Sequence, residues 1–276
     1  MMNIQQYYPI KENAEDCKHF AVTIRARVQE YIQEHRLKAL VLGISGGVDS
    51  ALCAALLKSV CECCNIPLIG RSITIETNKP DEIERSLKVG ENFCHDFEYI
   101  NLTNTYLENR KTLIDLDDSM RSKLRQGNLK ARMRMIHLYD LAQLHSGIVI
   151  STDNFTEYLT GFWTLHGDVG DYAPIMHLWK TEVYALATLL LTECNEKQKQ
   201  ALQSCIDATP VDGLGISSCD CEQLKVKDYF EADRLFVRYF SGEKELEAHP
   251  LIKRYQQSHY KRNNPVSLTR TQITHP

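Results

Sequence analysis

The sequence predicts an α/β protein with a doubly wound parallel sheet and a helical C-terminal part. Apolar runs typical of buried strands alternate with segments of helical periodicity between residues 39 and 150. The first strand leads through a turn rich in glycine and serine directly into a helix. Alternating strands and helices form parallel sheets whose ligands bind at the carboxyl ends of the strands. The turn is therefore expected to lie in the functional site.

The periodicity places each element along the chain. Strands are expected at 39–44, 67–76, 97–102 and 147–150. Helices are expected at 14–35, from residue 51, at 80–93, from residue 127, and near 181–191, 195–207, 221–240 and 243–260. The polar and acidic stretch 103–120 lacks a clear period and is expected to be a mobile connection. The first helix carries an apolar stripe that would pack on a sheet or on a partner subunit.

The 276 residues are expected to form a single domain. It would consist of an N-terminal helix at 14–36, an α/β core at 37–190 and a helical segment at 191–276. A hydrophobic content of 43% is ordinary for a soluble enzyme, and a net charge of −4 argues against a dedicated nucleic-acid surface. The first residues lack the features of a signal peptide, and no apolar run has membrane-spanning length. We therefore expect a cytoplasmic protein without a membrane partner.

The ten cysteines are expected to be mostly reduced thiols in that compartment. Cys61, Cys63 and Cys64 form one small group, and Cys219 and Cys221 form another. Their spacing differs from the Cys-x-x-Cys pairs of zinc sites. Thiols that act as small core residues are the favoured interpretation.

The turn after the first strand reads Ser-Gly-Gly-Val-Asp-Ser at residues 45–50. Its glycines allow the backbone to approach a ligand closely, and the following helix points unpaired N–H groups into the turn, which suits phosphate. Asp49 would be either a helix N-cap or a ligand of Mg²⁺ placed between the carboxylate and a polyphosphate. The N-cap alone does not explain the two glycines. A Walker loop is a poor match, because its lysine is missing.

This hexapeptide resembles the pyrophosphate loop of ATP pyrophosphatases. The resemblance implies that ATP is split into AMP and pyrophosphate while an oxygen of the substrate is adenylated. Two residues after the fourth strand fit this chemistry: Glu157 as a second carboxylate for Mg²⁺, and Thr152 as a nucleotide contact. Lys180 stands at the start of a helix, which is unfavourable for a cation unless a phosphate compensates its charge.

Other cations have two interpretations. Lys130, Arg132 and Arg134 open the predicted helix from residue 127, where they would either oppose the helix dipole until an anion binds or form a solvated basic face. Arg71 interrupts the second strand and would either snorkel from a sheet edge or reach the nucleotide. Arg71 is kept among the candidate ATP contacts.

Several longer motifs resemble those of ammonia-dependent NAD synthetases, in the same order. They are Ser-Gly-Gly-Val-Asp-Ser, Gly-Asn-Leu-Lys-Ala-Arg-Met-Arg-Met, Ser-Thr-Asp-Asn-x-x-Glu-Tyr, Thr-Gly-Phe-Trp-Thr and Pro-Ile-x-x-Leu-x-Lys-Thr-Glu-Val. The resemblance covers about residues 38–190 and resumes at Leu214 and at 259–262. It implies a homodimer that uses ATP and Mg²⁺ to convert deamido-NAD and ammonia into NAD, through an acyl-adenylate, with release of AMP and pyrophosphate.

The resemblance also implies roles for individual residues. ATP would contact Gly43, Ile44, Ser45, Gly46, Gly47, Val48, Asp49, Ser50, Thr152 and Lys180. Asp49 and Glu157 would hold Mg²⁺, and Asp49 and Lys180 would be catalytic. Deamido-NAD would contact Arg132, Asp171, Tyr260 and Lys261.

The chain departs from the family pattern mainly where the dinucleotide would bind. Leu165 replaces a usual lysine, the loop 167–171 is one residue short, and Val211 replaces a threonine before a missing acidic insertion. Two other function classes stay open: another ATP pyrophosphatase, of the amidotransferase or tRNA-modifying type, and a non-catalytic nucleotide-binding regulator.

The nitrogen donor is expected to be free ammonia. A synthetase core and a helical tail account for the 276 residues. A glutamine-hydrolysing domain would need on the order of 100 further residues and an activated cysteine. Whether a separate glutaminase supplies ammonia is left open by the sequence.

Overall fold

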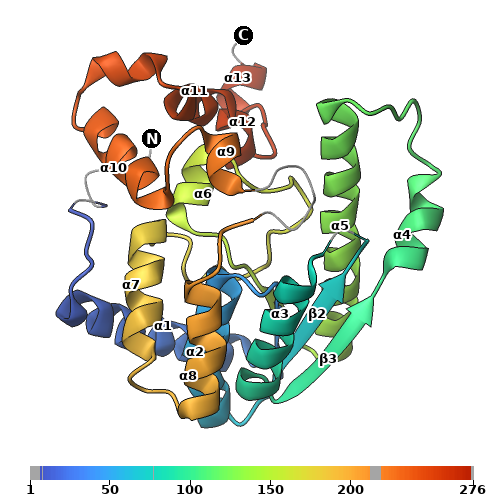
Figure 1. Cartoon of the computed structure of the whole chain (residues 1–276), viewed down its shortest axis with the longest axis vertical. Coiled ribbons are helices and arrows are strands. Elements are labelled where there is room, and N and C mark those ends of the chain that lie inside the picture. The colour runs from blue at the N-terminus through green and yellow to red at the C-terminus, as the bar shows by residue number, and fades with distance from the viewer. Residues whose placement is uncertain (1–6, 8, 77, 212–218, 275–276) are drawn as a thin grey trace.

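The computed structural model describes residues 7, 9–76, 78–211 and 219–274. Four strands form one sheet in the order β3-β2-β1-β4. Neighbouring strands run parallel, as the sequence predicted, and Figure 1 labels β2 and β3 of this sheet. They are β1 (Leu40–Gly43), β2 (Leu68–Thr74), β3 (Asp96–Asn101) and β4 (Ile148–Ile150). In the register of the sheet, Leu40 pairs with Leu68 on one side and Ile148 on the other. β1 is thus a central strand, which explains why it is apolar on both faces.

Helices cover both faces of this sheet. One face is packed by α1 (Ala14–His35), α2 (Val48–Cys64), α3 (Pro80–Phe93), α7 (Lys180–Leu190) and α8 (Glu196–Ile206), which share a core with Leu40 and Leu42. The other face is packed by α5 (Met120–Leu144), which contacts Val41 and Val149. The alternation of Leu40, Val41 and Leu42 between the two cores follows from the period of two in a strand.

A second core lies at the carboxyl-end side of the sheet. It is built by α6 (Phe155–Thr160), α9 (Asp220–Leu224), α10 (Tyr229–Phe240), the 3₁₀ helix η2 (Lys244–Ala248) and α11 (Pro250–Gln257). Two short helices, α12 (His259–Arg262) and α13 (Arg270–Thr274), follow and bury no residue. Phe155 and Trp179 contribute to this core from the central part of the chain, and Phe236 and Leu251 from the C-terminal part. Figure 1 shows α6 and α9 to α13 gathered at one end of the molecule.

The bounds predicted for α1 and α3 are confirmed, but two predictions on the middle of the chain are wrong. The stretch 103–120 contains a helix, α4 (Thr103–Arg110), which buries Tyr106. α5 begins at Met120, where the Ser119 side chain accepts a hydrogen bond from the backbone N–H of Ser122, and not at Gly127. The cations around Arg132 therefore lie in the middle of α5, and the argument from the helix dipole does not apply to them.

The predicted helix at 221–240 is two helices. Lys225 ends α9 in the left-handed conformation, with a φ of 58, and Asp228 caps α10. The segment predicted at 243–260 is likewise divided among η2, α11 and α12. The family resemblance at Leu214 lies outside the described residues.

The apolar stripe of α1 packs within the chain. Cys17, Ala21, Val28 and Ile32 are buried, and α1 lies against α2 and α7. The expected partner for this stripe was a sheet or a second subunit; in the structure it is a pair of helices that cover the sheet. The cysteines are free thiols, and the described residues contain no group of three or more potential ligands arranged to hold a metal ion.

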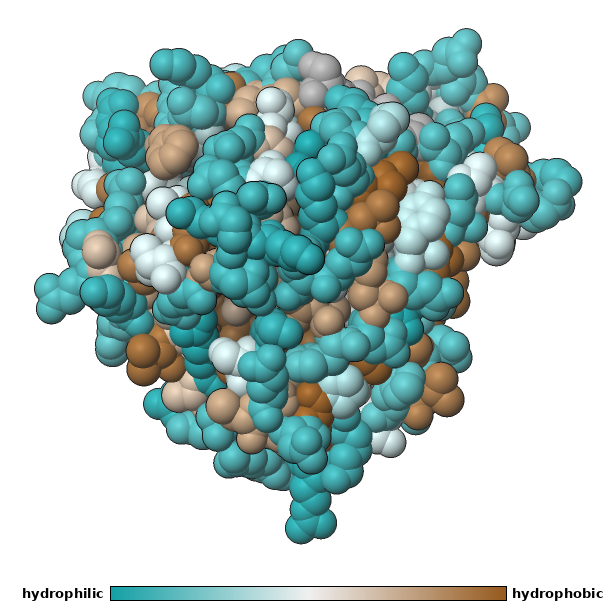
Figure 2. Space-filling view, turned by 60° about the horizontal axis from the view of Figure 1, so that its bottom comes forward, coloured by the Kyte–Doolittle hydropathy of each residue, from teal (hydrophilic) through white to brown (hydrophobic). Residues whose placement is uncertain are grey.

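The surface is mainly hydrophilic on the face drawn in Figure 2, where apolar residues appear as small separate patches. Within the described part of the chain, we find no helix with the length and apolar character needed to cross a membrane.

Candidate active site

The loop between β1 and α2 forms one wall of the candidate site. Gly46 has a φ of +82, and a Cβ at this position would come within 2.4 Å of the Glu82 carbonyl oxygen. Gly47 is the N-cap of α2 and donates its N–H to Ser45 Oγ at 3.2 Å. Gly46 therefore satisfies a local need of the backbone, because the chain turns left-handed there while it touches α3.

Ser50 supports this loop from behind. Its Oγ accepts a hydrogen bond from Ser45 N at 3.2 Å and donates one to Gly47 O at 3.1 Å. The side chain is buried and does not line the cavity described next. The structure thus places Ser50 as a brace of the loop, whereas the resemblance implied a direct contact with ATP.

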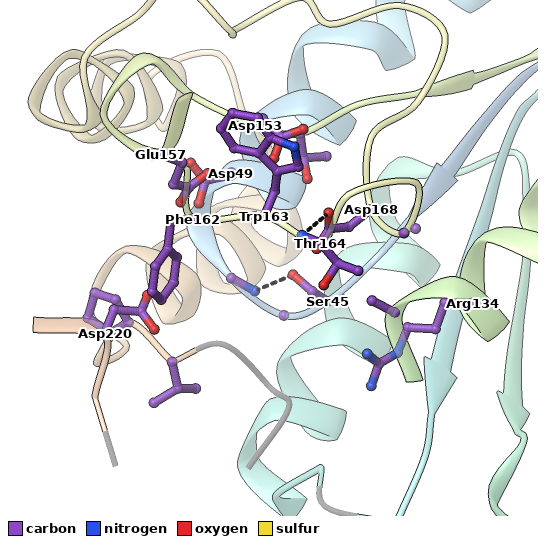
Figure 3. Close-up of a pocket in the computed structure, with 18 of the residues that line it drawn as sticks. Ser45, Asp49, Arg134, Asp153, Glu157, Phe162, Trp163, Thr164, Asp168 and Asp220 are labelled. Atoms are coloured by element: carbon purple, nitrogen blue, oxygen red, sulfur yellow. Dashed lines mark hydrogen bonds between the residues drawn. The ribbon is translucent and has the colours of Figure 1, made fainter. Parts of the chain in front are cut away.

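A cavity of about 1100 Å³ lies between this loop and the C-terminal core. Most of the predicted site residues line it: Gly43, Ile44, Ser45, Gly46, Gly47, Val48, Asp49, Arg71, Arg132, Thr152, Glu157, Lys180, Tyr260 and Lys261. Ser50 and Asp171 are absent from its wall. Figure 3 shows Asp49 and Glu157 close together at one end, Arg134 at the other, and Ser45 between them.

Asp49, Glu157 and Lys180 meet at that end of the cavity. Lys180 Nζ lies 2.5 Å from Asp49 Oδ2 and 3.0 Å from Glu157 Oε1, and the lysine side chain is only 3% exposed. Burial by itself lowers the pKa of Lys180, but Asp49 and Glu157 outweigh this effect and raise the pKa well above its ordinary value. The lysine is therefore a fixed positive charge. A positive charge at the start of a helix is unfavourable, and here the carboxylates of Asp49 in α2 and Glu157 in α6 compensate it.

Asn154 orients both carboxylates, and sequence reasoning missed it as a site residue. Asn154 Nδ2 donates to Asp49 Oδ1 at 2.8 Å. The same side chain accepts from Glu157 N at 3.0 Å, and Glu157 Oε2 accepts from Asn154 N at 3.3 Å, which is a capping box. An Asn followed three residues later by Glu is a recognisable signal for such a box.

Asp233 is a second residue that sequence reasoning missed. It is fully buried and accepts hydrogen bonds from the Thr156 hydroxyl, from Thr181 N at 2.8 Å and from Thr181 Oγ1 at 2.7 Å. Thr156 Oγ1 in turn accepts from Lys180 N at 3.0 Å. Asp233 thus ties the start of α7, with Lys180, to α6, with Glu157. Its only sequence signal was an acid on the apolar side of α10.

We expect Asp233→Ala to lower the free energy of unfolding by about 3 kcal/mol, since buried donors lose a charged acceptor. It should also reduce turnover, because α6 and α7 lose their common anchor. The measurements are urea unfolding and steady-state rates.

Asp228→Ala is the matched control for Asp233→Ala. Asp228 is the N-cap of the same helix and accepts from Glu231 N at 2.7 Å. Its loss should cost about 1 kcal/mol and leave turnover unchanged. Equal effects of the two substitutions on turnover would contradict the role given to Asp233.

Three of the four predicted dinucleotide residues form hydrogen bonds within the chain. Arg132 Nη2 donates to Leu165 O at 3.0 Å, and Lys261 Nζ donates to Gly161 O at 2.7 Å and to Trp163 O. Asp171 accepts from Val149 N at 2.9 Å and from the Tyr139 hydroxyl at 3.2 Å. These contacts hold the segment 161–171 over the cavity. Tyr260 is more than half exposed at the rim.

Arg71, Lys130 and Arg134 also form polar contacts within the chain. Arg71 lies in the middle of β2, and its Nη1 donates to Asp96 Oδ1 at 2.8 Å, although the residue also lines the cavity. Lys130 is buried beside Glu76, with 3.2 Å between Nζ and Oε2, and Arg134 Nε donates to Ile73 O at 3.0 Å. The solvated basic face is therefore wrong for Lys130 and Arg134.

Two further carboxyl groups line the cavity beside Trp163. Asp168 accepts from Thr164 N at 2.8 Å (Figure 3), and Asp153 accepts from Ser151 Oγ at 2.5 Å. Burial raises the pKa of each of them to about 7. Asp153, Trp163, Leu165 and Lys261 also line an adjoining cavity of about 470 Å³. Burial thus favours the neutral form of both acids, an effect that depends on the fold and could not be predicted from the sequence.

Comparison with known proteins agrees with the motifs. Residues 21–265 match the NAD synthase family. The NH(3)-dependent NAD(+) synthetase of Methanococcoides burtonii is 34% identical over 77% of this chain and 76% of its own length. The enzyme of the same name from Mycoplasmopsis pulmonis is 31% identical over 84% of this chain and 82% of its own length.

Solved structures share the fold. The NMN synthetase of Francisella tularensis superimposes with a TM-score of 0.75 at 24% identity, over 92% of this chain and 98% of its own. The NH3-dependent NAD synthetase of Campylobacter jejuni gives a TM-score of 0.67 at 24% identity, over 92% of this chain and 99% of its own. The family match extends from α1 to the C-terminal helices and includes every residue of the Asp49, Glu157 and Lys180 cluster. The chain therefore belongs to the NAD synthase family.

Proposed function

We propose that this chain is an ammonia-dependent NAD synthetase, a ligase that converts deamido-NAD, ammonia and ATP into NAD, AMP and pyrophosphate. The observation that carries the proposal is the meeting of Asp49, Glu157 and Lys180 beside the Gly46-Gly47 turn in one large cavity. Curated relatives that are named NH(3)-dependent NAD(+) synthetase support it. A cytoplasmic location stays a prediction from the sequence.

The residues present fit a magnesium ion. Asp49 and Glu157 present hard oxygen atoms to the same point, and in the structure a cation, the Lys180 ammonium, already lies between them. Mg²⁺ in nucleotide enzymes is usually held by one or two carboxylates, with phosphate and water completing the shell. Bound there, it would stabilise negative charge on the departing pyrophosphate.

The rest of the chemistry follows from positioning. The nicotinate carboxylate would attack the α-phosphorus of ATP, so that an acyl-adenylate forms and pyrophosphate leaves. Ammonia would then attack the acyl carbon, lose a proton and displace AMP. The backbone N–H groups at the start of α2 and the Lys180 ammonium would bind the pyrophosphate, which is electrostatic stabilisation by preorganised groups. The reaction needs no nucleophilic side chain.

Formation of AMP and pyrophosphate tests the proposal. We expect both products, in equal amounts with NAD, only when deamido-NAD, ammonium chloride, MgATP and the enzyme are all present. Glutamine in place of ammonium should not support the reaction. A non-catalytic nucleotide-binding regulator would bind ATP without releasing pyrophosphate, and another ATP pyrophosphatase would release it with a different acid.

The corresponding mononucleotide acid is a second candidate substrate, favoured by Leu165. This residue contributes an apolar side chain to both cavities where the family pattern has a lysine that faces the dinucleotide. Arg132 and Lys261 are also engaged with loop carbonyls, which leaves few charges for a second phosphate. The two acids are compared by kcat/KM in the same assay. A higher value for the mononucleotide would revise the substrate and keep the ATP chemistry.

We also expect a homodimer, because the family resemblance implies a dinucleotide site that is shared across a two-fold axis. The apolar stripe of α1 is used within the chain, so any contribution of this helix to the contact would come from its other side. Sedimentation at micromolar concentration is the measurement. A fully active monomer would contradict the expectation and weaken the proposed role of Lys261 toward the dinucleotide.

A further inference from the structure

The position of Lys180 bears on how a metal ion enters the site. Its ammonium lies 2.5 Å from Asp49 Oδ2 and 3.0 Å from Glu157 Oε1, the two carboxylates proposed as metal ligands. These are its only hydrogen-bond acceptors in the structure as described, and the Tyr229 ring covers it at 4.8 Å from the centroid. In the free enzyme an internal cation thus bridges the two carboxylates and compensates part of their negative charge.

The ammonium and a divalent cation exclude each other from this place. Mg²⁺ binds carboxylate oxygens at about 2.1 Å, so an ion on Asp49 Oδ2 would lie at most about 4.6 Å from Lys180 Nζ. Both cations would also compete for the same lone pairs. In a site this buried, like charges at such a distance are poorly screened by water.

The carboxylates are less free to move than the lysine. Asn154 holds Asp49 Oδ1 at 2.8 Å and holds Glu157 through the capping box of α6. Lys180 carries its charge on a flexible four-carbon stem, and its side chain faces the cavity that also contains the Gly46-Gly47 turn. A phosphate bound at that turn would offer the ammonium a new anionic partner.

We propose that Lys180 occupies the metal position of the free enzyme, so that the divalent cation binds there only together with a nucleotide whose phosphate takes over the ammonium. Lys180 is then a specificity-determining residue: the enzyme accepts the metal–nucleotide complex and rejects the free metal ion. The inference rests on the proposed function, because it assumes ATP at the turn and a metal ion on Asp49 and Glu157. Metal and nucleotide must strengthen the binding of each other by the same factor.

Binding of Mn²⁺, measured by electron paramagnetic resonance on the full chain, tests the proposal without turnover. The probes are Mn²⁺ alone and Mn²⁺ with α,β-methylene-ATP, which cannot be cleaved at the α-phosphorus. For the wild type we expect weak binding of free Mn²⁺ and binding at least about tenfold tighter with the analogue. For Lys180→Met we expect free Mn²⁺ to bind at least about tenfold tighter than to the wild type.

Two variants distinguish occupation of the carboxylate pair by Lys180 from the general effect of removing a positive charge from the cavity. Lys261→Met removes one positive charge from the same cavity but leaves the carboxylate pair occupied, because Lys261 donates to the Gly161 and Trp163 carbonyls. It should bind free Mn²⁺ like the wild type. The double variant Lys180→Met, Glu157→Gln should lose the tighter binding of free Mn²⁺ that Lys180→Met alone shows. Lys180→Gln serves if thermal melting shows that Lys180→Met is unfolded.

The outcomes distinguish this inference from the proposed function. Wild-type binding of free Mn²⁺ as tight as in Lys180→Met, or an equal gain in Lys261→Met, would overturn the inference while amide formation continued. Tighter binding of free Mn²⁺ by the double variant Lys180→Met, Glu157→Gln would overturn the inference as well. Absence of Mn²⁺ binding in every variant, even with the analogue, would instead remove the metal assignment. Absence of pyrophosphate release in the activity assay would remove the proposed function itself.

Discussion

Asp49→Asn is expected to reduce turnover about 10²-fold or more while the fold is retained. The substitution removes one charged ligand of the proposed magnesium site and also the acceptor that lies 2.5 Å from Lys180. The loss of the metal ligand weakens the stabilisation of charge on the departing pyrophosphate. The measurement is the rate of pyrophosphate release at saturating ATP over a range of Mg²⁺ concentrations. Circular dichroism checks the fold.

Glu157→Gln probes the same site from the other helix and should also reduce turnover about 10²-fold or more. Removal of Mg²⁺ with a chelator should abolish the activity of the wild type. If either variant kept near wild-type activity at limiting Mg²⁺, the metal assignment would be wrong.

Gly46→Ala is expected to have the second large effect. A Cβ on Gly46 would meet the Glu82 carbonyl oxygen at 2.4 Å and the Ser86 nitrogen at 3.2 Å, and neither backbone atom can yield without a shift of α3. The left-handed φ of +82 adds about 1 kcal/mol of strain for a residue with a side chain. Because the turn is the proposed pyrophosphate cradle, kcat/KM for ATP should fall about 10²-fold or more.

Gly242→Ala is the matched control for that experiment. Gly242 also has a positive φ, of +107, but a Cβ there would meet nothing within 4 Å. It should lower the free energy of unfolding by about 1 kcal/mol and leave kcat/KM for ATP unchanged. If Gly46→Ala changed kcat/KM no more than Gly242→Ala does, the turn would not be the nucleotide cradle.

Much of the fold was predictable because its causes are local. The run Leu40, Val41 and Leu42 predicted a strand buried on both faces, and the structure pairs it on both sides. Pro80 and the acids that follow it predicted the start of α3. α4 escaped because its signal, a buried Tyr106, depends on packing against α5. The true start of α5 has a local signal, the Ser119 cap, which apolar periodicity alone does not reveal.

The candidate site divides in the same way. The Ser-Gly-Gly-Val-Asp-Ser turn could be predicted, since a left-handed glycine, a helix start and an acid beside it are properties of adjacent residues. The partners of Lys180 and Asp233 could not be predicted, because they lie far away in the chain. Lys180 looked like a cation that needed a phosphate, and the fold supplies it with Asp49 and Glu157.

By itself, then, the sequence determined the β1-turn-α2 unit and the chemistry of the residues that it carries. Only the tertiary structure decided which charges remain available to a ligand. Arg132 and Lys261 had the right chemical groups, but folding directs their hydrogen bonds to carbonyls of the segment 161–171. Short-range order follows from backbone geometry and periodicity, whereas the pairing of buried polar groups depends on which distant elements the apolar cores bring together.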